Sequence, residues 1–129
     1  KYEEIFDLSD IFNIVDNSNQ PVRCHQLGGK GFLSDGIDSY PPFFIGIWEM
    51  LNKGLYDKAQ IEWDKVMIPF GKFSAKTLAI NGGEGKIEKA MSEIMGLPMG
   101  PPRPPSLPLT DNEMAELKSL MTSWGWPVP

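Results

Sequence analysis

The sequence predicts an α/β fold, the C-terminal part of a (β/α)8 barrel with about two short strands, followed by a mostly helical tail. Three observations predict it. Two short apolar runs typical of strands lie within the first 34 residues, separated by a stretch long enough for a short helix. Beyond residue 41, apolar residues recur only at helical spacing. Strands that alternate with helices indicate a parallel sheet, and 129 residues are about half of the roughly 250 in a whole barrel. As an isolated chain, the protein is therefore expected to be predominantly α-helical.

The barrel part is predicted to span residues 1–54. After the tail of a helix over residues 2–8, the β-branched run Phe12–Asp16 is predicted to be a buried strand. A short helix follows over residues 21–27, because proline suits a first helical turn. Gly31–Ser34 is predicted to be the second strand. A helix with one apolar face and a glycine at its end closes this part; the face and the glycine are Phe44, Ile47, Trp48, Leu51 and Gly54.

Residues 55–129 are predicted to form the helical tail. Its first apolar stripe runs from Leu55 to Phe70 and contains Pro69, where we expect a kink or a break. A second stripe runs from Ile87 to Met95, and Gly96 is expected to cap it. Six prolines between residues 97 and 109 predict an extended, stiff connector.

A capping box marks the start of the last helix. The Thr110 hydroxyl can accept a hydrogen bond from the Glu113 backbone, while the Glu113 carboxylate reaches back to Thr110. Apolar residues from Met114 to Trp124 line one face of this helix, and Gly125 is predicted to stop it. These stripes and the four tryptophans are interpreted as core rather than as a ligand cage.

Composition limits the classes of function. The net charge is −5, and no cluster of Lys and Arg suggests a nucleic-acid surface. No apolar run approaches the roughly 18 residues that span a membrane. The single cysteine cannot form an internal disulfide, which favours a reducing compartment, and we predict a cytoplasmic protein. Because the chain begins with Lys1, we expect it to start within a longer reading frame or after a processing step.

Sequence motifs for cofactors and metals are incomplete. The glycine-rich run Leu27–Ser34 fails the P-loop pattern because Gly31 follows Lys30, and residues 81–87 fail it as well. The run is interpreted as a tight turn between helix and strand. We therefore predict no cofactor.

Two groups of reactive side chains remain. Cys24 and His25 are the only Cys and His, and neighbours on a helix point apart, so structural roles are favoured over a metal or nucleophile site. Asp16, Asp35 and Asp38 flank the C-terminal ends of the two predicted strands, where α/β barrels place their chemistry. They could hold a metal or polarise a hydroxyl, but capping and turn stabilisation are favoured, and we predict no metal site.

Several motifs resemble the dihydrodipicolinate synthase and N-acetylneuraminate lyase family. The segment Gly96–Pro105 resembles that family's G-L-P-x-G-P-x-R-P-P segment. The segment 107–110 and the amphipathic helix after it also look like the family's C-terminus. Leu27–Ser34 is similar to its eighth strand, G-A-x-G-x-I-S, and Tyr40-Pro41 followed by Gly54–Ala59 looks like its helix pair. The resemblance covers nearly the whole chain.

The resemblance implies a Schiff-base lyase or aldolase that condenses a strand-borne lysine with pyruvate or another 2-oxo acid. That lysine and the family's Tyr and Thr residues belong to strands that are missing here. Only Lys1 lies upstream of the first strand, and its spacing is too short, so we assign no catalytic residue. The resemblance implies a substrate-binding rim at Asp16 and Asn17, where the family often has Gly-Asp, and at Leu33 and Ser34.

We therefore expect a C-terminal fragment of a Schiff-base lyase that is inactive alone and binds a 2-oxo acid only in the intact enzyme. A homo-oligomer is expected, because uncovered strands and apolar helix faces make too large a patch for a monomer. Two alternatives stay open: a non-catalytic domain that oligomerises, or one half of a split barrel that another chain completes.

Overall fold

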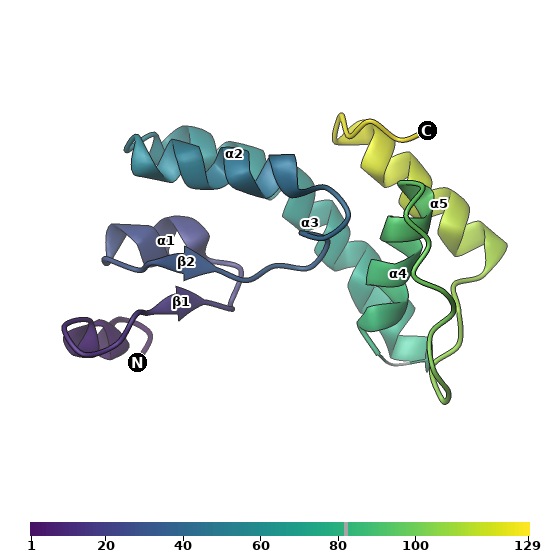
Figure 1. Ribbon diagram of the computed structural model, residues 1–129, viewed down its shortest axis with the longest axis horizontal. Coiled ribbons are helices and arrows are strands. Elements are labelled where there is room, and N and C mark those ends of the chain that lie inside the picture. The colour runs from purple at the N-terminus through teal and green to yellow at the C-terminus, as the bar shows by residue number, and fades with distance from the viewer. Residues whose placement is uncertain (82) are drawn as a thin grey trace.

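The computed structural model describes residues 1–81 and 83–129. One end of the molecule holds a 3-10 helix, two strands and a short helix; the other holds α4 and α5, with α3 running between the two ends (Figure 1). In chain order the elements are η1 (Glu3–Leu8), β1 (Val15–Asp16), α1 (Pro21–Gln26), β2 (Gly31–Phe32), α2 (Pro41–Asn52), α3 (Tyr56–Asn81), α4 (Gly85–Ile94) and α5 (Asp111–Ser123).

The two strands form a parallel pair joined through α1. Val15 lies opposite Gly31 and Asp16 opposite Phe32. The Lys30 amide donates to the Ile14 carbonyl at 2.8 Å, and the Leu33 amide donates to the Asp16 carbonyl at 2.8 Å. The predicted order of strand, short helix and strand is confirmed. Both strands are shorter than the sequence pattern indicates.

The prediction of a buried strand over residues 12–16 is wrong for its first part. Residues 12–14 are outside β1, and the Phe12 side chain is 60% exposed. Val15 is also exposed. A β-branched run becomes a buried strand only when neighbouring elements cover it. Within the described chain, β1 pairs with β2 alone, so this apolar run lies open.

The hydrophobic core lies where α2 packs on α3. Phe44, Ile47 and Leu51 of α2 are buried, as are Trp63 and Val66 of α3. Full burial of a side chain of this size stabilises a fold by about 1.5–3 kcal/mol. These contacts therefore hold α2 and α3 together.

The same core crosses the division predicted between residues 54 and 55. It extends along α3 to α4 and α5, which contribute Met91, Leu117 and Met121. Three of the four tryptophans, Trp63, Trp124 and Trp126, are buried in it, which confirms their interpretation as core. The division into parts 1–54 and 55–129 stays a prediction.

The break expected at Pro69 does not occur. Helix α3 runs without interruption through this residue. A proline inside a helix removes one backbone hydrogen bond, here the bond to the Lys65 carbonyl. Lys65 is exposed, so water can reach that region, while the neighbouring Val66 and Phe70 are anchored in the core. Packing on both sides of Pro69 thus offsets its cost.

The last helix begins as the sequence predicts. The Glu113 amide donates to Thr110 Oγ1 at 3.3 Å, and the Thr110 amide donates to Glu113 Oε2 at 2.7 Å. Gly96 and Gly125, which follow α4 and α5, have φ of 81° and 82°, a left-handed conformation that glycine adopts without strain. The predicted ends of both helices are confirmed.

Replacing Thr110 with Ala should lower the free energy of unfolding by about 1 kcal/mol, because one backbone donor of α5 loses its cap. Urea unfolding followed by circular dichroism measures this. The hydrogen bonds from Thr110 lower the pKa of Glu113 below its ordinary value of 4.5. A lowered pKa means that the stabilisation is present above that value and fades as pH falls through the folded-state pKa, so the difference between Thr110→Ala and wild type should shrink in acid.

Thr122→Ala is the matched control, since the Thr122 hydroxyl only donates to the Lys118 carbonyl within the same helix. Its stability should equal that of the wild type or exceed it slightly, because Ala is the better helix former. Equal losses in the two variants would contradict the role of the capping box.

Candidate functional site

The C-terminal ends of β1 and β2 lie side by side. The hydrogen bond between the Leu33 amide and the Asp16 carbonyl joins the two chain segments just where the strands finish. The predicted rim therefore lies at the C-terminal end of the sheet. Its four residues are Asp16, Asn17, Leu33 and Ser34. In parallel α/β folds ligands bind at this end of the strands.

At this end of the sheet, the Asp16 carboxylate accepts hydrogen bonds from three neighbouring residues. Its side chain is 2% exposed. Oδ1 accepts hydrogen bonds from the Ser18 hydroxyl at 2.6 Å, the Ser18 amide at 3.2 Å and the Tyr2 hydroxyl at 2.9 Å. Oδ2 accepts from the Gln20 amide at 2.8 Å, at the start of α1. A buried carboxylate is tolerated when its lone pairs are filled in this way. These bonds turn the Asp16 carboxylate toward the chain around it.

Tyr2 is the partner that sequence reasoning missed. Its hydroxyl ties η1 to Asp16, and the Arg23 guanidinium lies 5.0 Å from the centre of its ring. Burial, followed by the hydrogen bond to Asp16 and the charge of Asp16, raises the pKa of Tyr2 above its ordinary value. Tyr2 and Asp16 are 14 residues apart with no periodic relation, so no sequence pattern points to this pair.

The remaining rim residues differ in exposure. The Leu33 side chain is 59% exposed, and Asn17 is exposed as well. Ser34 is half-buried, with its hydroxyl 3.4 Å from the Asp35 carbonyl and 4.0 Å from Met67 Sδ of α3. Leu33 and Asn17 are thus open to a ligand or a neighbouring segment. The substrate-binding role of all four residues stays a prediction.

The other two carboxylates face α4. Burial, and then the negative charges of Asp35 and Asp38, raise the pKa of Glu88 on that helix. The Ser92 hydroxyl lies 3.5 Å from Asp38 Oδ2 and 3.1 Å from the buried Ser39 hydroxyl. Among the described residues, no group of three His, Cys, Asp or Glu side chains is arranged to hold a metal ion.

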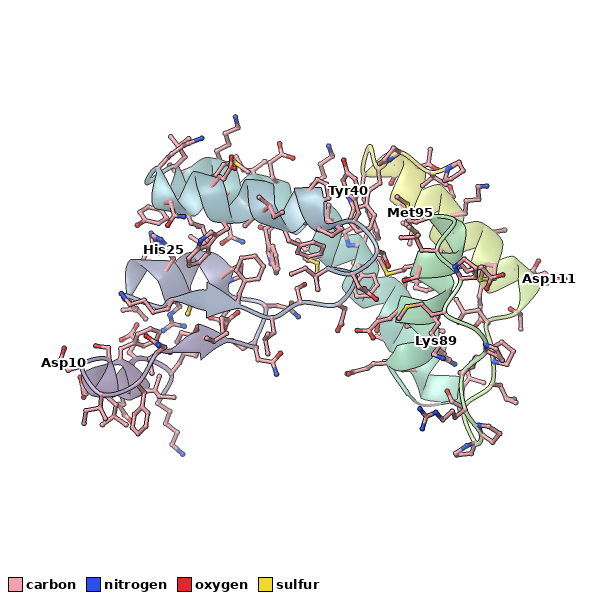
Figure 2. The ribbon with its side chains drawn as sticks, in the orientation of Figure 1. Asp10, His25, Tyr40, Lys89, Met95 and Asp111 are labelled. Atoms are coloured by element: carbon pink, nitrogen blue, oxygen red, sulfur yellow. The ribbon has the colours of Figure 1, made fainter. Side chains whose placement is uncertain are left out.

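Cys24 and His25 point apart. Cys24 is buried, its Sγ lies 3.8 Å from the Gly31 carbonyl, and burial raises the pKa of its thiol. The His25 side chain projects from α1 toward α2 (Figure 2), and its ring nitrogens lie 3.2 Å from the Tyr56 hydroxyl and 3.3 Å from Asn52 Oδ1. The two side chains form no catalytic pair, and a raised pKa makes a thiol a poor nucleophile.

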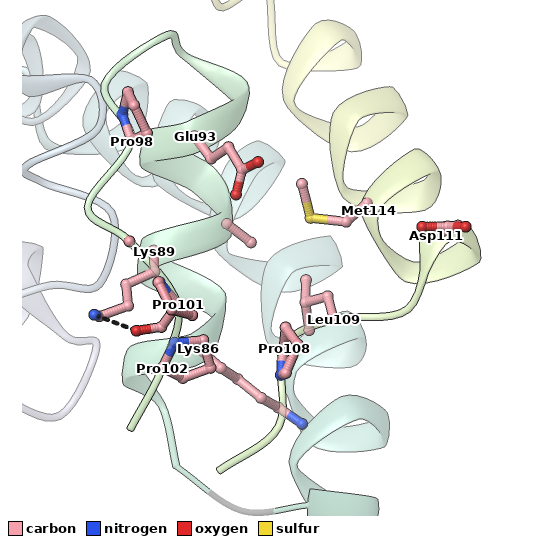
Figure 3. A pocket seen from close by; sticks show the side chains of 12 residues that line it. Lys86, Lys89, Glu93, Pro98, Pro101, Pro102, Pro108, Leu109, Asp111 and Met114 are labelled. Carbon is pink, nitrogen blue, oxygen red and sulfur yellow. Dashed lines mark hydrogen bonds between the residues drawn. The ribbon is translucent and has the colours of Figure 1, made fainter. Parts of the chain in front are cut away.

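A groove of about 600 Å³ lies far along the molecule, between α4, the proline-rich connector and the start of α5 (Figure 3). Lys89 Nζ donates to the Pro101 carbonyl at 2.9 Å and approaches the Met99 carbonyl at 3.4 Å, which holds the connector against α4. Lys86 is buried, and its Nζ donates to the Thr77 carbonyl at 3.2 Å at the end of α3. Both lysines thus fasten backbone segments.

No described lysine has the setting of a Schiff-base nucleophile at the strand ends. Lys1 and Lys30 are exposed, and Lys86, the one lysine buried in the described chain, lies in the distant groove.

The described chain also has no helix long and apolar enough to cross a membrane.

Comparison with known proteins places these features. The 4-hydroxy-tetrahydrodipicolinate synthase of Methanococcus vannielii is 27% identical over 122 residues. The crystal structure of dihydrodipicolinate synthase from Oceanobacillus iheyensis superposes with a TM-score of 0.67 at 28% identity, over 86% of this chain. The chain resembles the C-terminal portion of dihydrodipicolinate synthases. No protein-family model matches it.

The chain spans less than half the length of the synthases that it matches. The match covers 95% of this chain but 40% of the Methanococcus synthase, and 37% of the Oceanobacillus chain. The described chain is mostly helical, with two short parallel strands, and it matches part of a dihydrodipicolinate synthase structure. These two findings confirm the predicted fold class.

Replacing Asp16 with Asn should destabilise the fold by about 2 kcal/mol or more, because the new NH2 group must face either the Gln20 amide or the Ser18 amide and hydroxyl donors, and one set of buried donors loses its acceptor. Urea unfolding measures the loss. Asn17→Ala is the matched control on the adjacent exposed residue and should change stability by less than about 0.5 kcal/mol. If Asp16→Asn is as stable as the wild type, Asp16 does not organise the strand ends.

Proposed function

We propose that this chain is the C-terminal part of a Schiff-base lyase or aldolase that acts on 2-oxo acids, and that it has no lyase activity alone. The observation that carries the proposal is the match to two dihydrodipicolinate synthases over most of this chain and less than half of theirs. The rim residues at the strand ends support it, since they lie where a barrel enzyme binds substrate.

The expected inactivity follows from the chemistry of the nucleophile. A lysine attacks a 2-oxo acid as the neutral amine, and water leaves as the imine forms. Enzymes make that amine available near neutral pH by desolvating it in an apolar pocket. Lys1 and Lys30 are exposed to water, so neither has the desolvated setting that this chemistry needs. The nucleophile of the intact protein therefore belongs to a part outside this chain.

The rim would serve the intact enzyme in different ways. We assign Leu33 to the apolar wall behind the lysine, and Asn17 and Ser34 to polar contacts with the 2-oxo acid. Asp16 acts as a positioning residue, because its carboxylate is committed to Tyr2, Ser18 and Gln20. A cytoplasmic, homo-oligomeric enzyme without a cofactor completes the proposal.

One observation favours a second candidate, half of a split barrel. Phe12 and Leu33 are largely exposed beside two short strands, an arrangement that suits a partner chain carrying the remaining strands. A non-catalytic oligomerising domain would need the same apolar surface. Recovery of an N-terminal half-barrel with this chain would favour the split barrel, and a folded monomer would count against the oligomerising domain.

Borohydride reduction in the presence of pyruvate tests the proposal, because it converts the imine into a stable secondary amine that intact mass detects. The isolated, folded chain should give no adduct. The same chain mixed with the portion of the Methanococcus synthase that precedes the matched stretch should give one adduct, on a lysine of that portion. That portion without the chain is the control.

Peptide mapping of an adduct to any lysine of the isolated chain would show that the chain is itself catalytic. If the two pieces associate but yield no adduct, the assignment to Schiff-base chemistry fails.

A further inference from the structure

Lys86 is the one lysine that the described chain buries. Its side chain is 4% exposed, although a lysine is almost never buried to this extent without a partner of opposite charge. It lies in the first turn of α4, and its Nζ donates to the Thr77 carbonyl near the end of α3 at 3.2 Å. None of the ion pairs of the described chain includes it. The partner of this buried ammonium is therefore a backbone carbonyl and not a carboxylate.

The contact with Thr77 compensates the charge of Lys86 only in part. The carbonyl end of a helix carries a partial negative charge, which makes an ammonium near the end of α3 tolerable. One carbonyl, however, occupies one of the three donors of an ammonium group. Removing an ammonium from water is costly unless a counter-charge and further hydrogen bonds replace the water. The setting of Lys86 thus favours an anion that the described residues do not themselves provide.

The groove between α4, the proline-rich connector and α5 has room for such an anion. Lys86 lines this groove, whose volume of about 600 Å³ is in the range of small-molecule sites. Figure 3 shows the Lys86 side chain reaching from α4 past Pro108 toward the end of α3. The first turns of α4 and α5 both border the groove, and the positive end of a helix dipole adds to the attraction for an anion.

We propose that this groove binds a small oxyanion, a carboxylate or a phosphate, through the ammonium group of Lys86. The proposal goes beyond the lyase assignment and does not rest on it. A lysine ammonium is a compact point charge, so it binds both kinds of oxyanion in the same way.

The other charged residues of the groove limit the size of the ligand. Glu93 and Asp111 are exposed, and both lie away from the Lys86 ammonium (Figure 3). Lys86 and Glu93 are seven residues apart on α4, which separates them by about 10 Å along the helix axis. A small anion at Lys86 therefore avoids these carboxylates, whereas a long polyanion would meet them.

Titration of the chain with inorganic phosphate, followed by amide NMR spectra, tests the proposal. Sodium chloride of equal ionic strength is the reference. The amide signals of Lys86, Lys89 and Met114, which line the groove, should shift and saturate, whereas those of Lys30 and Leu33 at the sheet should not. Succinate, a dicarboxylate, is titrated in the same way. Saturable shifts with phosphate alone support the proposal and identify a phosphate ligand, and shifts with succinate alone support it and identify a carboxylate ligand.

Lys86→Met tests the role of the ammonium, because it removes the charge and keeps an unbranched side chain. It should weaken anion binding at least about tenfold, since a hydrogen bond to a charged group is lost. Lys72→Met is the matched control, since Lys72 is exposed on α3, does not line the groove and carries the same charge. It should leave the affinity unchanged.

Circular dichroism and urea unfolding show whether the two variants keep the fold, and the titration of the wild type decides the proposal even if Lys86→Met does not. The absence of a saturable shift with both anions would overturn the inference. Saturation confined to amides outside the groove would overturn it as well, and so would equal weakening of binding by the two folded variants.

Discussion

The pairing of β1 with β2 in parallel is the constraint on which the strand end of this molecule depends. A parallel pair needs a crossover on one face and cover on the other. Helix α1 supplies the crossover, and the Asp16 carboxylate fixes its start through the Gln20 amide. The described chain supplies no cover for Val15 and Leu33. The two strands therefore pair in parallel register, but the face that carries Val15 and Leu33 is exposed.

The helical part is under no such constraint. Helices α2 and α3 bury apolar faces against each other, and α4 and α5 extend the same core along α3. Side-chain contacts fasten the irregular segments, as Lys89 does for the proline-rich connector and the Thr110–Glu113 pair does for the start of α5. The helices thus have a core of their own, whereas the strands beside the predicted rim have an uncovered face. This difference explains how a chain that matches 40% of a synthase can have a folded core.

Local signals made the helices predictable. Phe44, Ile47 and Leu51 repeat at helical spacing and are buried, and the capping box at Thr110 forms as its residue types indicate. Predictions failed where packing outweighed local preference. Pro69 is carried inside α3 by its buried neighbours, and Phe12 remains exposed because nothing in the described chain covers it. The contact between Tyr2 and Asp16 depends on the path of the chain, which no local pattern encodes. The substrate-binding role of the four rim residues is a prediction from family resemblance alone, since the position of Asp16 at a strand end by itself favours capping or turn stabilisation.

Amide hydrogen exchange of the isolated chain tests the central claim, that the strand end needs cover from outside this chain while the helical core does not. The Lys30 and Leu33 amides bond to the Ile14 and Asp16 carbonyls in the sheet, and Phe70 and Phe73 lie in the buried part of α3. Exchange by local opening should make the two sheet amides at least about a hundredfold less protected than the two helix amides. Equal protection at all four would mean that the sheet is stable as it stands, and the account of an open barrel edge would be wrong.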